Sequence, residues 1–202
     1  MSLPNALLGV LEARPMTGYE LTQFFDASTG WVWSAPQSQI YPLLRQMERD
    51  GLIEGEDQVR GSRLQRTVYS ITDQGVAQLR SWAATYHPPP PPREPFFLQA
   101  LYFDSLPPEQ ARAVLTAYLS DQRAAAEAAQ QHREQLLAGE TMLVKERLAR
   151  RPRAEHEAIV RLKANVFAGV AAVAQARASW AEAELVLLDE PKQLRGSRRA
   201  TG

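Results

Sequence analysis

The 202-residue sequence predicts a mainly α-helical protein with one small β-hairpin. Three observations support this fold class. Apolar residues recur at helical spacing over most of the chain. Residues 52–71 contain two short β-type runs separated by a glycine-containing loop. A run of five consecutive prolines divides the chain, so we expect two folded parts joined by a linker.

The first two helices are defined by apolar spacing and by a capping motif. Residues 2–13 carry apolar side chains at helical intervals, and Pro15 ends this helix. Thr17 stands three residues before Glu20, which predicts a capping box at the start of the second helix. The residues expected on the buried face of the second helix are Leu21, Phe24 and Phe25.

The third helix contains a proline. Apolar residues at i, i+3, i+4 and i+7 from Ile40 to Met47 predict the helix. Pro42 lies within this pattern, although a proline in a helix interior costs about 3 kcal/mol. Either the helix begins near Ser34 and is kinked at Pro42, or it begins near Gln39. In the second case Pro42 would lie in the first turn, where it is tolerated. The sequence leaves both accounts open.

A hairpin and a fourth helix complete the N-terminal part. Residues 52–56 and 65–71 are predicted to be the two strands, and the fourth helix is expected to begin at Thr72. Three helices, a hairpin and a further helix, in this order, make a winged helix-turn-helix. Residues 1–86 are therefore predicted to form this domain, with the hairpin as the wing.

The proline run is predicted to be a linker at residues 87–95. Consecutive prolines favour the extended polyproline II conformation, which acts as a stiff spacer. A ligand for an SH3-like domain is the alternative interpretation of this run. Residues 96–190 are predicted to form an all-α C-terminal dimerisation domain, and residues 191–202 a basic, disordered tail.

The C-terminal part is expected to contain a short aromatic helix, a long helix to about Leu137, a short piece at 141–150 and a final helix at 155–188. Apolar residues fall on seven-residue spacing along the final helix, and such a seam requires a partner surface. Other helices of the domain or a second subunit could supply it. The predicted interface residues are Ile159, Leu162, Val166, Val173 and Trp180.

One face of the third helix carries hydrogen-bonding side chains opposite its apolar stripe. Gln37, Tyr41 and Arg45 lie at i, i+4 and i+8, with Ser38 beside the first. A helix in the DNA major groove uses such a distribution, with polar residues at its start and an arginine further along. A solvated surface helix is the alternative. The predicted wing adds arginines suited to a phosphate backbone, namely Arg60, Arg63 and Arg66.

These residues together resemble the PadR family of transcriptional regulators. The resemblance rests on Met16-Thr17-Gly18-Tyr19-Glu20-Leu21, on Ile40-Tyr41-Pro42, and on the leucines, Glu48 and Gly51 that follow. It covers most of residues 2–83, and the Ile-Tyr-Pro unit is its hallmark. Residues 95–188 resemble, less specifically, the helical region of longer members and of virulence activators.

The resemblance implies roles for individual residues. Pro42 would belong to the DNA-reading helix, with Tyr41 at the DNA backbone and Gln37, Ser38 and Gln39 near bases. Tyr19 is counted among the predicted DNA contacts as well. Double-stranded DNA with a palindrome-like site is the predicted partner, read by a homodimer that represses transcription. Thr17 replaces a common histidine, and Gly61-Ser62-Arg63 replaces a Gly-Arg-Pro, which changes the expected wing contacts.

Composition argues against several other classes. The chain has no cysteine, and its three histidines lack partners at metal-ligand or catalytic-triad spacing. We therefore predict no enzyme, no metal site and no cofactor. No apolar run reaches the ~20 residues needed to span a bilayer, and the N-terminus lacks the basic region of a signal peptide. A cytoplasmic protein without membrane contact is expected.

Two functional interpretations remain beside each other. A winged-helix protein–protein adaptor without DNA binding is the alternative, supported by the proline run and by the long helical seam. Residues 1–85 hold seven basic and nine acidic residues, so DNA affinity is expected to rest on local geometry and on two copies binding together. The favoured interpretation is a regulator released from DNA by a small aromatic effector. Aromatic residues flank the linker. They could fill a core, or they could line a pocket between the domains. The predicted pocket residues are Trp33, Phe96, Phe97 and Tyr102.

Overall fold

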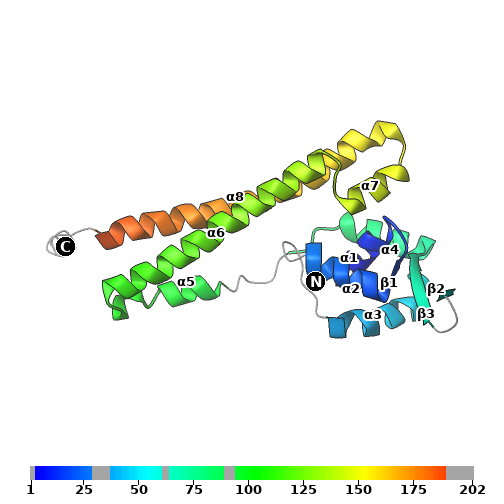
Figure 1. The fold of residues 1–202 in the computed structure, drawn as a ribbon, viewed down its shortest axis with the longest axis horizontal. Helices are drawn as coiled ribbons and strands as arrows, with labels where there is room; N and C mark the ends of the chain where they lie inside the picture. Colours follow the sequence, from blue (N-terminus) through cyan, green and yellow to red (C-terminus); the bar gives the residue numbers. More distant parts are fainter. Residues whose placement is uncertain (1–2, 29–36, 61–63, 89–93, 190–202) are drawn as a thin grey trace. The chain divides into compact units, whose positions relative to one another are not determined.

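The computed structural model describes residues 3–28, 37–60, 64–88 and 94–189. The chain divides into two compact units, which are described separately. The first unit holds residues 1–88 and 135–161, and the second holds residues 89–134 and 162–202. The elements (Figure 1) are α1 (Leu3–Leu11), β1 (Met16–Thr17), α2 (Gly18–Ser28), α3 (Gln37–Arg49), β2 (Ile53–Arg60), β3 (Leu64–Ile71), α4 (Asp73–Ala83), α5 (Pro95–Ala100), η1 (Phe103–Ser105), α6 (Pro108–Leu137), α7 (Met142–Ala149) and α8 (Arg153–Asp189).

The first unit is built on a core of large apolar side chains, called here the N-terminal core. Helices α1, α2 and α3 supply most of it, and Ile53 and Tyr69 contribute from the sheet. The predicted apolar stripes are confirmed in α1, α2 and α3, because their members line this core. The residues of the core are Leu3, Leu7, Leu8, Val10, Leu11, Met16, Leu21, Phe25, Ile40, Leu44, Met47, Leu52, Ile53 and Tyr69.

Two predicted helix starts are present. The Thr17 N–H donates to Glu20 Oε2 at 2.8 Å, and the Glu20 N–H donates to Thr17 Oγ1 at 3.2 Å. These reciprocal bonds are the predicted capping box. At α4, Thr72 is the N-cap and its Oγ1 accepts from the Gly75 N–H at 3.1 Å. The two caps fix the start of α2, which precedes α3, and the start of α4, which follows the wing.

The sheet has three strands in the order β1-β3-β2. The hairpin prediction is confirmed in position, but β2 continues to Arg60 rather than ending at residue 56. Cross-strand bonds explain the longer strand, because Thr67 Oγ1 donates to Asp57 Oδ1 at 2.7 Å across the ladder. Strand β1, which pairs Met16 with Tyr69, is missing from the sequence prediction. Two residues are too few to show an alternating pattern.

Pro42 lies inside α3, five residues after its first residue, Gln37. Neither sequence account describes this arrangement fully. A start near Ser34 falls on residues 29–36, which lie outside the described part. A start near Gln39 is too late, because the described helix already includes Gln37 and Ser38. Because Pro42 has no N–H, it cannot donate to the carbonyl of Ser38, four residues earlier. The Ser38 carbonyl therefore lacks the helical bond that it would accept from any other residue at position 42.

Helix α7 packs with the first unit, although it follows the long helix α6 in sequence. Val144 is buried, and Leu143 packs against the N-terminal core. Arg147 forms an ion pair with Glu12, and its Nη2 donates to the Gly9 carbonyl of α1 at 2.9 Å. The predicted boundary at the proline run assigns residues 135–161 to the helical part. These contacts explain why the structure groups them with the winged-helix part instead.

The second unit consists of α5, η1 and most of α6 and α8. Helices α6 and α8 lie side by side (Figure 1), and ion pairs from Arg112 to Asp189 and from Arg123 to Glu182 show that they run antiparallel. Alanines form much of the buried face of α8, which lets the two helices approach closely. These buried alanines are Ala164, Ala174, Ala178 and Ala181.

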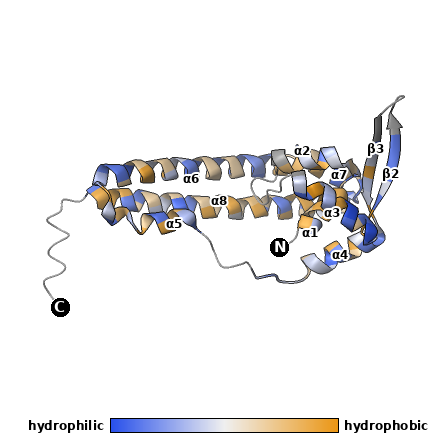
Figure 2. Ribbon diagram, turned by 90° about the horizontal axis from the view of Figure 1, so that it is seen from below, coloured by the Kyte–Doolittle hydropathy of each residue, from blue (hydrophilic) through white to orange (hydrophobic). Residues whose placement is uncertain are grey.

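Polar and apolar residues alternate along α6 and α8 (Figure 2). In the described ranges, every helix is too short or too polar to cross a bilayer.

Candidate nucleic-acid interface

Helix α3 has one buried face and one exposed face. Ile40 and Leu44 are fully buried, and they hold the helix against the N-terminal core. Ser38, Tyr41 and Arg45 are exposed or nearly so on the opposite side. Their spacing of three and four residues gives one polar face. The structure thus brings together three of the residues predicted to contact DNA.

Tyr41 stands against the backbone of α2. A Cβ atom added at Gly18 would lie 2.7 Å from Tyr41 Cε1, which is closer than side-chain contacts allow. Gly18 is therefore a close-approach position that seats the tyrosine ring. The next residue, Tyr19, is 60% exposed, and its hydroxyl accepts a bond from Gln23 Nε2 at 2.7 Å. The start of α2 thus contacts one tyrosine, Tyr41 of α3, and carries another, Tyr19, that is exposed.

The other two predicted residues of α3, Gln37 and Gln39, are not shown on the face that carries Tyr41. Gln37 is the first residue of the helix, and its side chain lies outside the described part. Gln39 is exposed. It stands four residues before Leu43 and seven before Gln46, so it shares their side of the helix rather than the face of Tyr41. The predicted contact of Gln39 with bases therefore does not follow from the face that carries Tyr41.

A carboxylate ties the wing to α3. Glu48 Oε1 accepts from the Gly55 N–H of β2 at 3.1 Å. On the strands, Arg66 Nη2 donates to Gln58 Oε1 at 3.2 Å, which holds the arginine along the exposed ladder. Of the other predicted wing arginines, Arg60 ends β2 with its side chain outside the described part, and Arg63 lies wholly outside it.

Charge near the start of α2 is fixed by the capping box. The pKa of Glu20 is lowered, chiefly because its carboxylate accepts from the Thr17 backbone N–H, and despite partial burial. Arg14 lies 3.6 Å from the same carboxylate, and Arg66 adds a weaker attraction. Glu20 is thus held ionised by its hydrogen bonds and by neighbouring arginines, which limits the negative potential that it projects.

Three of the five predicted dimer residues form an exposed stripe on α8. Leu162 is 70% exposed, and Val166 and Val173 are each 55% exposed. Ile159 is half-buried, and Trp180 packs into the apolar cluster of the second unit. Apart from Trp180, the seven-residue spacing continues on the exposed side through Gly169, Ala176, Ala183 and Leu187.

An aromatic cluster occupies the second unit. Phe96 stacks on Tyr118 with ring centroids 3.6 Å apart, and Phe97 meets Trp180 edge-on at 4.8 Å. Burial raises the pKa of Tyr118. Two of the four predicted effector residues, Phe96 and Phe97, belong to this cluster. Tyr102 is 63% exposed, and Trp33 lies outside the described residues.

A cavity of about 510 Å³ adjoins this cluster within the second unit. Phe97 and Trp180 form part of its wall, and Glu184 is the charged residue among those that line it. Tyr102 does not line it. The full set of lining residues is Phe97, Ala100, Leu101, Phe103, Leu115, Trp180, Glu184 and Leu188.

Three residues that the sequence analysis names make contacts at these sites that it did not predict. Gly18 carried a signal in the sequence. Glycine is a poor helix former, so its place at the start of a helix can indicate that another group approaches the backbone closely. Glu48 and Trp180 carried a weaker signal. A charged residue on a helix is normally solvated, and a tryptophan on a heptad seam normally faces a partner. Their contacts with Gly55 and Phe97 join residues far apart in sequence.

An exposed polar helix beside a two-stranded wing, on a core of three helices, defines a winged helix-turn-helix. Residues 7–81 match the Transcriptional regulator PadR-like family. The negative transcriptional regulator PadR of Bacillus subtilis is 31% identical over 137 residues, which cover 67% of this chain and 75% of the relative. The chain belongs to the PadR family of transcriptional regulators. It is therefore classed with regulators and not with enzymes.

Further relatives agree with this assignment. A probable transcriptional regulator of Mycobacterium tuberculosis is 39% identical over 84 residues, or 42% of this chain and 44% of the relative. The structure of Bacillus subtilis PadR with operator DNA is similar with a TM-score of 0.72 at 28% identity, covering 94% of this chain and 99% of that one. The Vibrio cholerae virulence activator AphA gives a TM-score of 0.62 at 26% identity, covering 93% and 98%.

Proposed function

We propose that the protein is a sequence-specific DNA-binding regulator that reads the major groove with α3 and the adjacent phosphates with its wing. The observation that carries this proposal is the two-faced character of α3. Its apolar side is fully buried, and its exposed side presents Ser38, Tyr41 and Arg45. Hydroxyls and a guanidinium on a helix of this kind are suited to base edges and phosphates.

The relatives support the same role. Bacillus subtilis PadR has been crystallised with operator DNA, and it is named a negative transcriptional regulator. By this likeness we infer repression as the regulatory mode. The acidic residues at the base of the wing, including Glu54 and Glu56, are exposed. Affinity is therefore expected to rest on local geometry and on two copies binding together.

The test is selection of bound fragments from genomic DNA, followed by titration of the enriched site at several salt concentrations. We expect a palindrome-like site whose affinity falls steeply with salt, because phosphate contacts release counterions. Absence of any enriched fragment at low salt would contradict the proposal and favour a protein–protein adaptor.

Gly18 offers a specific probe of the α3 surface. Gly18→Ala would displace the Tyr41 ring, and we expect affinity for the selected site to fall roughly tenfold. The matched control is Gly9→Ala, since a Cβ atom at Gly9 meets nothing within 4 Å. Equal affinities for the two variants would show that the seat of Tyr41 does not matter for DNA binding.

We infer that the functional form is a homodimer joined through α8. The support is the exposed apolar stripe around Leu162, Val166 and Val173, because a long apolar seam is stable when a partner helix covers it. Val173→Asp should convert the dimer to a monomer in sedimentation experiments. Gln175→Asp adds the same charge on an exposed position off the stripe, and it should leave the dimer intact. A wild-type protein that sediments as a monomer at all concentrations would overturn the inference.

We infer further that a small aromatic effector occupies the cavity beside Phe97 and Trp180. Bacillus subtilis PadR has been crystallised with p-coumaric acid, at a TM-score of 0.68 and 27% identity, covering 94% of this chain and 100% of that one. Here the carboxylate of Glu184 in the lining favours an uncharged ring over an aromatic acid. An effector found by release of the selected DNA should lose potency with Phe97→Leu. Tyr102→Leu alters an exposed neighbour outside the lining and should not change it. The opposite pattern would exclude this cavity.

A further inference from the structure

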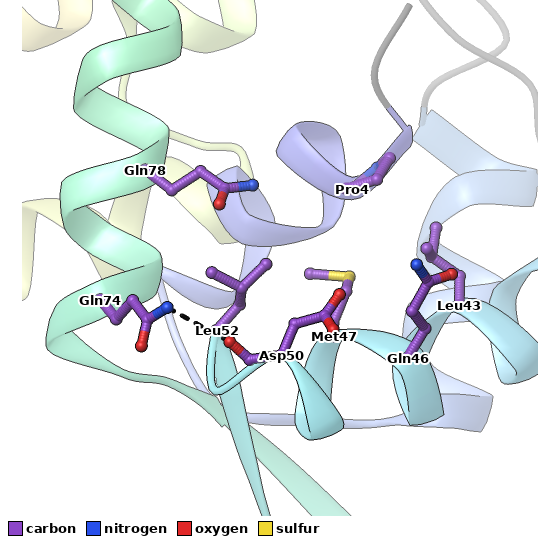
Figure 3. Close-up of a pocket in the computed structure, with 8 residues that line it drawn as sticks. All are labelled: Pro4, Leu43, Gln46, Met47, Asp50, Leu52, Gln74 and Gln78. Carbon is purple, nitrogen blue, oxygen red and sulfur yellow. Dashed lines mark hydrogen bonds between the residues drawn. The ribbon is translucent and has the colours of Figure 1, made fainter.

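The first unit contains a second cavity, on the side of α3 that carries Leu43 and Met47. Its volume is about 330 Å³, which is within the range of small-molecule sites. Figure 3 shows Gln74 and Gln78 extending from α4 on one side, Leu43 and Gln46 on α3 on the other, and Leu52 and Met47 between them. We call it the α3 pocket. It is lined by Pro4, Leu43, Gln46, Met47, Asp50, Leu52, Gln74 and Gln78.

The floor of the α3 pocket is apolar. Met47 and Leu52 are almost completely buried, at 1% and 6% exposure, and Leu43 and Pro4 extend the same surface. A methionine thioether is polarizable and makes favourable contacts with aromatic rings. The floor is therefore suited to a flat apolar body, and an aromatic ring is the best match.

The rim of the pocket is polar. Gln46, Asp50, Gln74 and Gln78 are exposed and surround the apolar floor. Gln74 Nε2 donates to the Asp50 backbone carbonyl at 3.2 Å, which ties the start of α4 to the end of α3. The rim is thereby held in place by a bond between the two helices, while the Asp50 carboxylate remains on the pocket side (Figure 3).

The charge of the lining is negative. Asp50 is the one ionisable residue among the lining residues of this described pocket. It directly follows the C-terminal end of α3, where the helix dipole is negative. The bond from the Leu52 N–H to the Met47 carbonyl, at 2.9 Å, and the positive φ of Gly51 close the helix there. An ammonium group would gain from the carboxylate and from glutamine oxygens, whereas a carboxylate would be repelled.

We propose that the α3 pocket binds a small organic cation that combines a flat aromatic body with an ammonium group. The ring lies on Met47 and Leu52, and the ammonium group donates to Asp50. This site is separate from the cavity beside Trp180 and from the exposed face of Ser38, Tyr41 and Arg45. Since α3 supplies both the pocket wall and that face, an occupant would act on the helix proposed to read DNA.

The test uses three probes with the same indole ring, titrated into the full chain without DNA. Tryptamine carries an ammonium group, tryptophol a hydroxyl group and indole-3-propionate a carboxylate. We expect saturable binding of tryptamine, with an affinity roughly tenfold higher than that of tryptophol, because a charge-assisted bond is stronger than a neutral one. Equal affinities for the three probes, or no saturable binding of tryptamine, would overturn the proposal.

Matched variants locate the binding site. Asp50→Asn keeps the shape of an exposed side chain and removes its charge, so it should abolish the preference for tryptamine over tryptophol. Glu184→Gln removes the carboxylate of the other cavity and should leave the preference unchanged. If Glu184→Gln removes the preference and Asp50→Asn does not, the ligand occupies the second unit and the proposal is wrong.

The methionine methyl groups give a direct readout. The chain has four methionines, of which Met47 lines the pocket and Met16 and Met142 do not. With methyl-labelled methionine, tryptamine should shift the Met47 signal, which a Met47→Leu variant assigns. Shifts confined to Met16 or Met142 would contradict the site. Because no DNA is present, this result is independent of whether the protein binds DNA.

Discussion

The two units of the chain use their large apolar residues in opposite ways. The first unit buries Leu7, Leu8, Ile40, Met47 and Phe25 to 2% exposure or less. In the second unit the fully buried residues are mainly alanines, while Leu162, Val166 and Val173 are more than half exposed. Large side chains stabilise a fold in proportion to the apolar area that they bury. The first unit therefore has a core of its own, and the second keeps much of its apolar area at the surface.

Because of this difference, substitutions in the first unit should change the stability of the monomer, and substitutions on the α8 stripe should change its assembly. A substitution in the N-terminal core removes contacts that the folded monomer needs. A substitution on the α8 stripe removes surface that contributes only when something covers it. Substitutions of both kinds test that contrast.

Leu7→Ala should lower the free energy of unfolding by about 3–5 kcal/mol, since it deletes a fully buried side chain and leaves a cavity. Leu162→Ala, on the exposed stripe, should change it by about 0.5 kcal/mol or less in dilute monomer. Urea denaturation of both variants at low concentration measures the difference. Similar losses would show that the second unit has a core beyond the described contacts.

Arg147→Ala should cost about 1.5–3 kcal/mol, because the guanidinium bonds both the Glu12 carboxylate and the Gly9 carbonyl. Arg147 and Glu12 are largely buried, at 16% and 21% side-chain exposure. Arg150→Ala removes an exposed arginine one residue beyond α7 and serves as the control. Thermal unfolding would compare them, and an equal effect would mean that α7 is not fastened to α1 by this residue.

Thr17→Ala should cost about 1 kcal/mol through loss of the N-cap bond. The same motif predicts a pH dependence. The pKa of Glu20 is lower in the folded chain than in the unfolded chain, so its stabilising contribution is fully present above the unfolded pKa. It is lost as pH falls through the folded pKa. The stability difference between the wild type and Glu20→Gln should therefore shrink on acidification, and a constant difference from pH 7 to pH 3 would contradict this.

The smallest effect is expected for the ion pair between Arg123 and Glu182. Their side chains are 62% and 42% exposed, so solvent screens the attraction. A double-mutant cycle with Arg123→Ala and Glu182→Ala should give a coupling of about 0–1 kcal/mol, which falls further in salt. A larger, salt-insensitive coupling would indicate that the contact between α6 and α8 depends on charge more than on its alanines.

Local features of the fold were predictable because they depend on neighbours in sequence. Thr17 and Glu20 are three residues apart, and the buried face of α3 follows from spacing alone. The contacts that differ from expectation are long-range. The pair of Glu12 and Arg147 joins residues more than a hundred positions apart, and periodicity within α7 carries no sign of it.

In the candidate sites, too, local features were predictable and long-range contacts were not. The polar face of α3 could be predicted from spacing, whereas the seat of Tyr41 on Gly18 depends on how closely α2 and α3 approach each other. Clustering of aromatic residues near the linker predicted Phe96 and Phe97 together. It gave no indication that Tyr118 and Trp180, on two other helices, complete the cluster.

The fastening of α7 to α1 has a consequence for how the protein is made. The ribosome releases residues 1–88 first, yet Arg147 and Val144 emerge only after the intervening stretch has been translated. At ordinary synthesis rates this delay is on the order of seconds. During that interval the apolar surface that Leu143 later covers is exposed to chaperones and proteases. A fragment cut at the proline run would remain in this unfinished state permanently, so a shortened version of the winged-helix part should include residues 135–161, reconnected by an artificial loop.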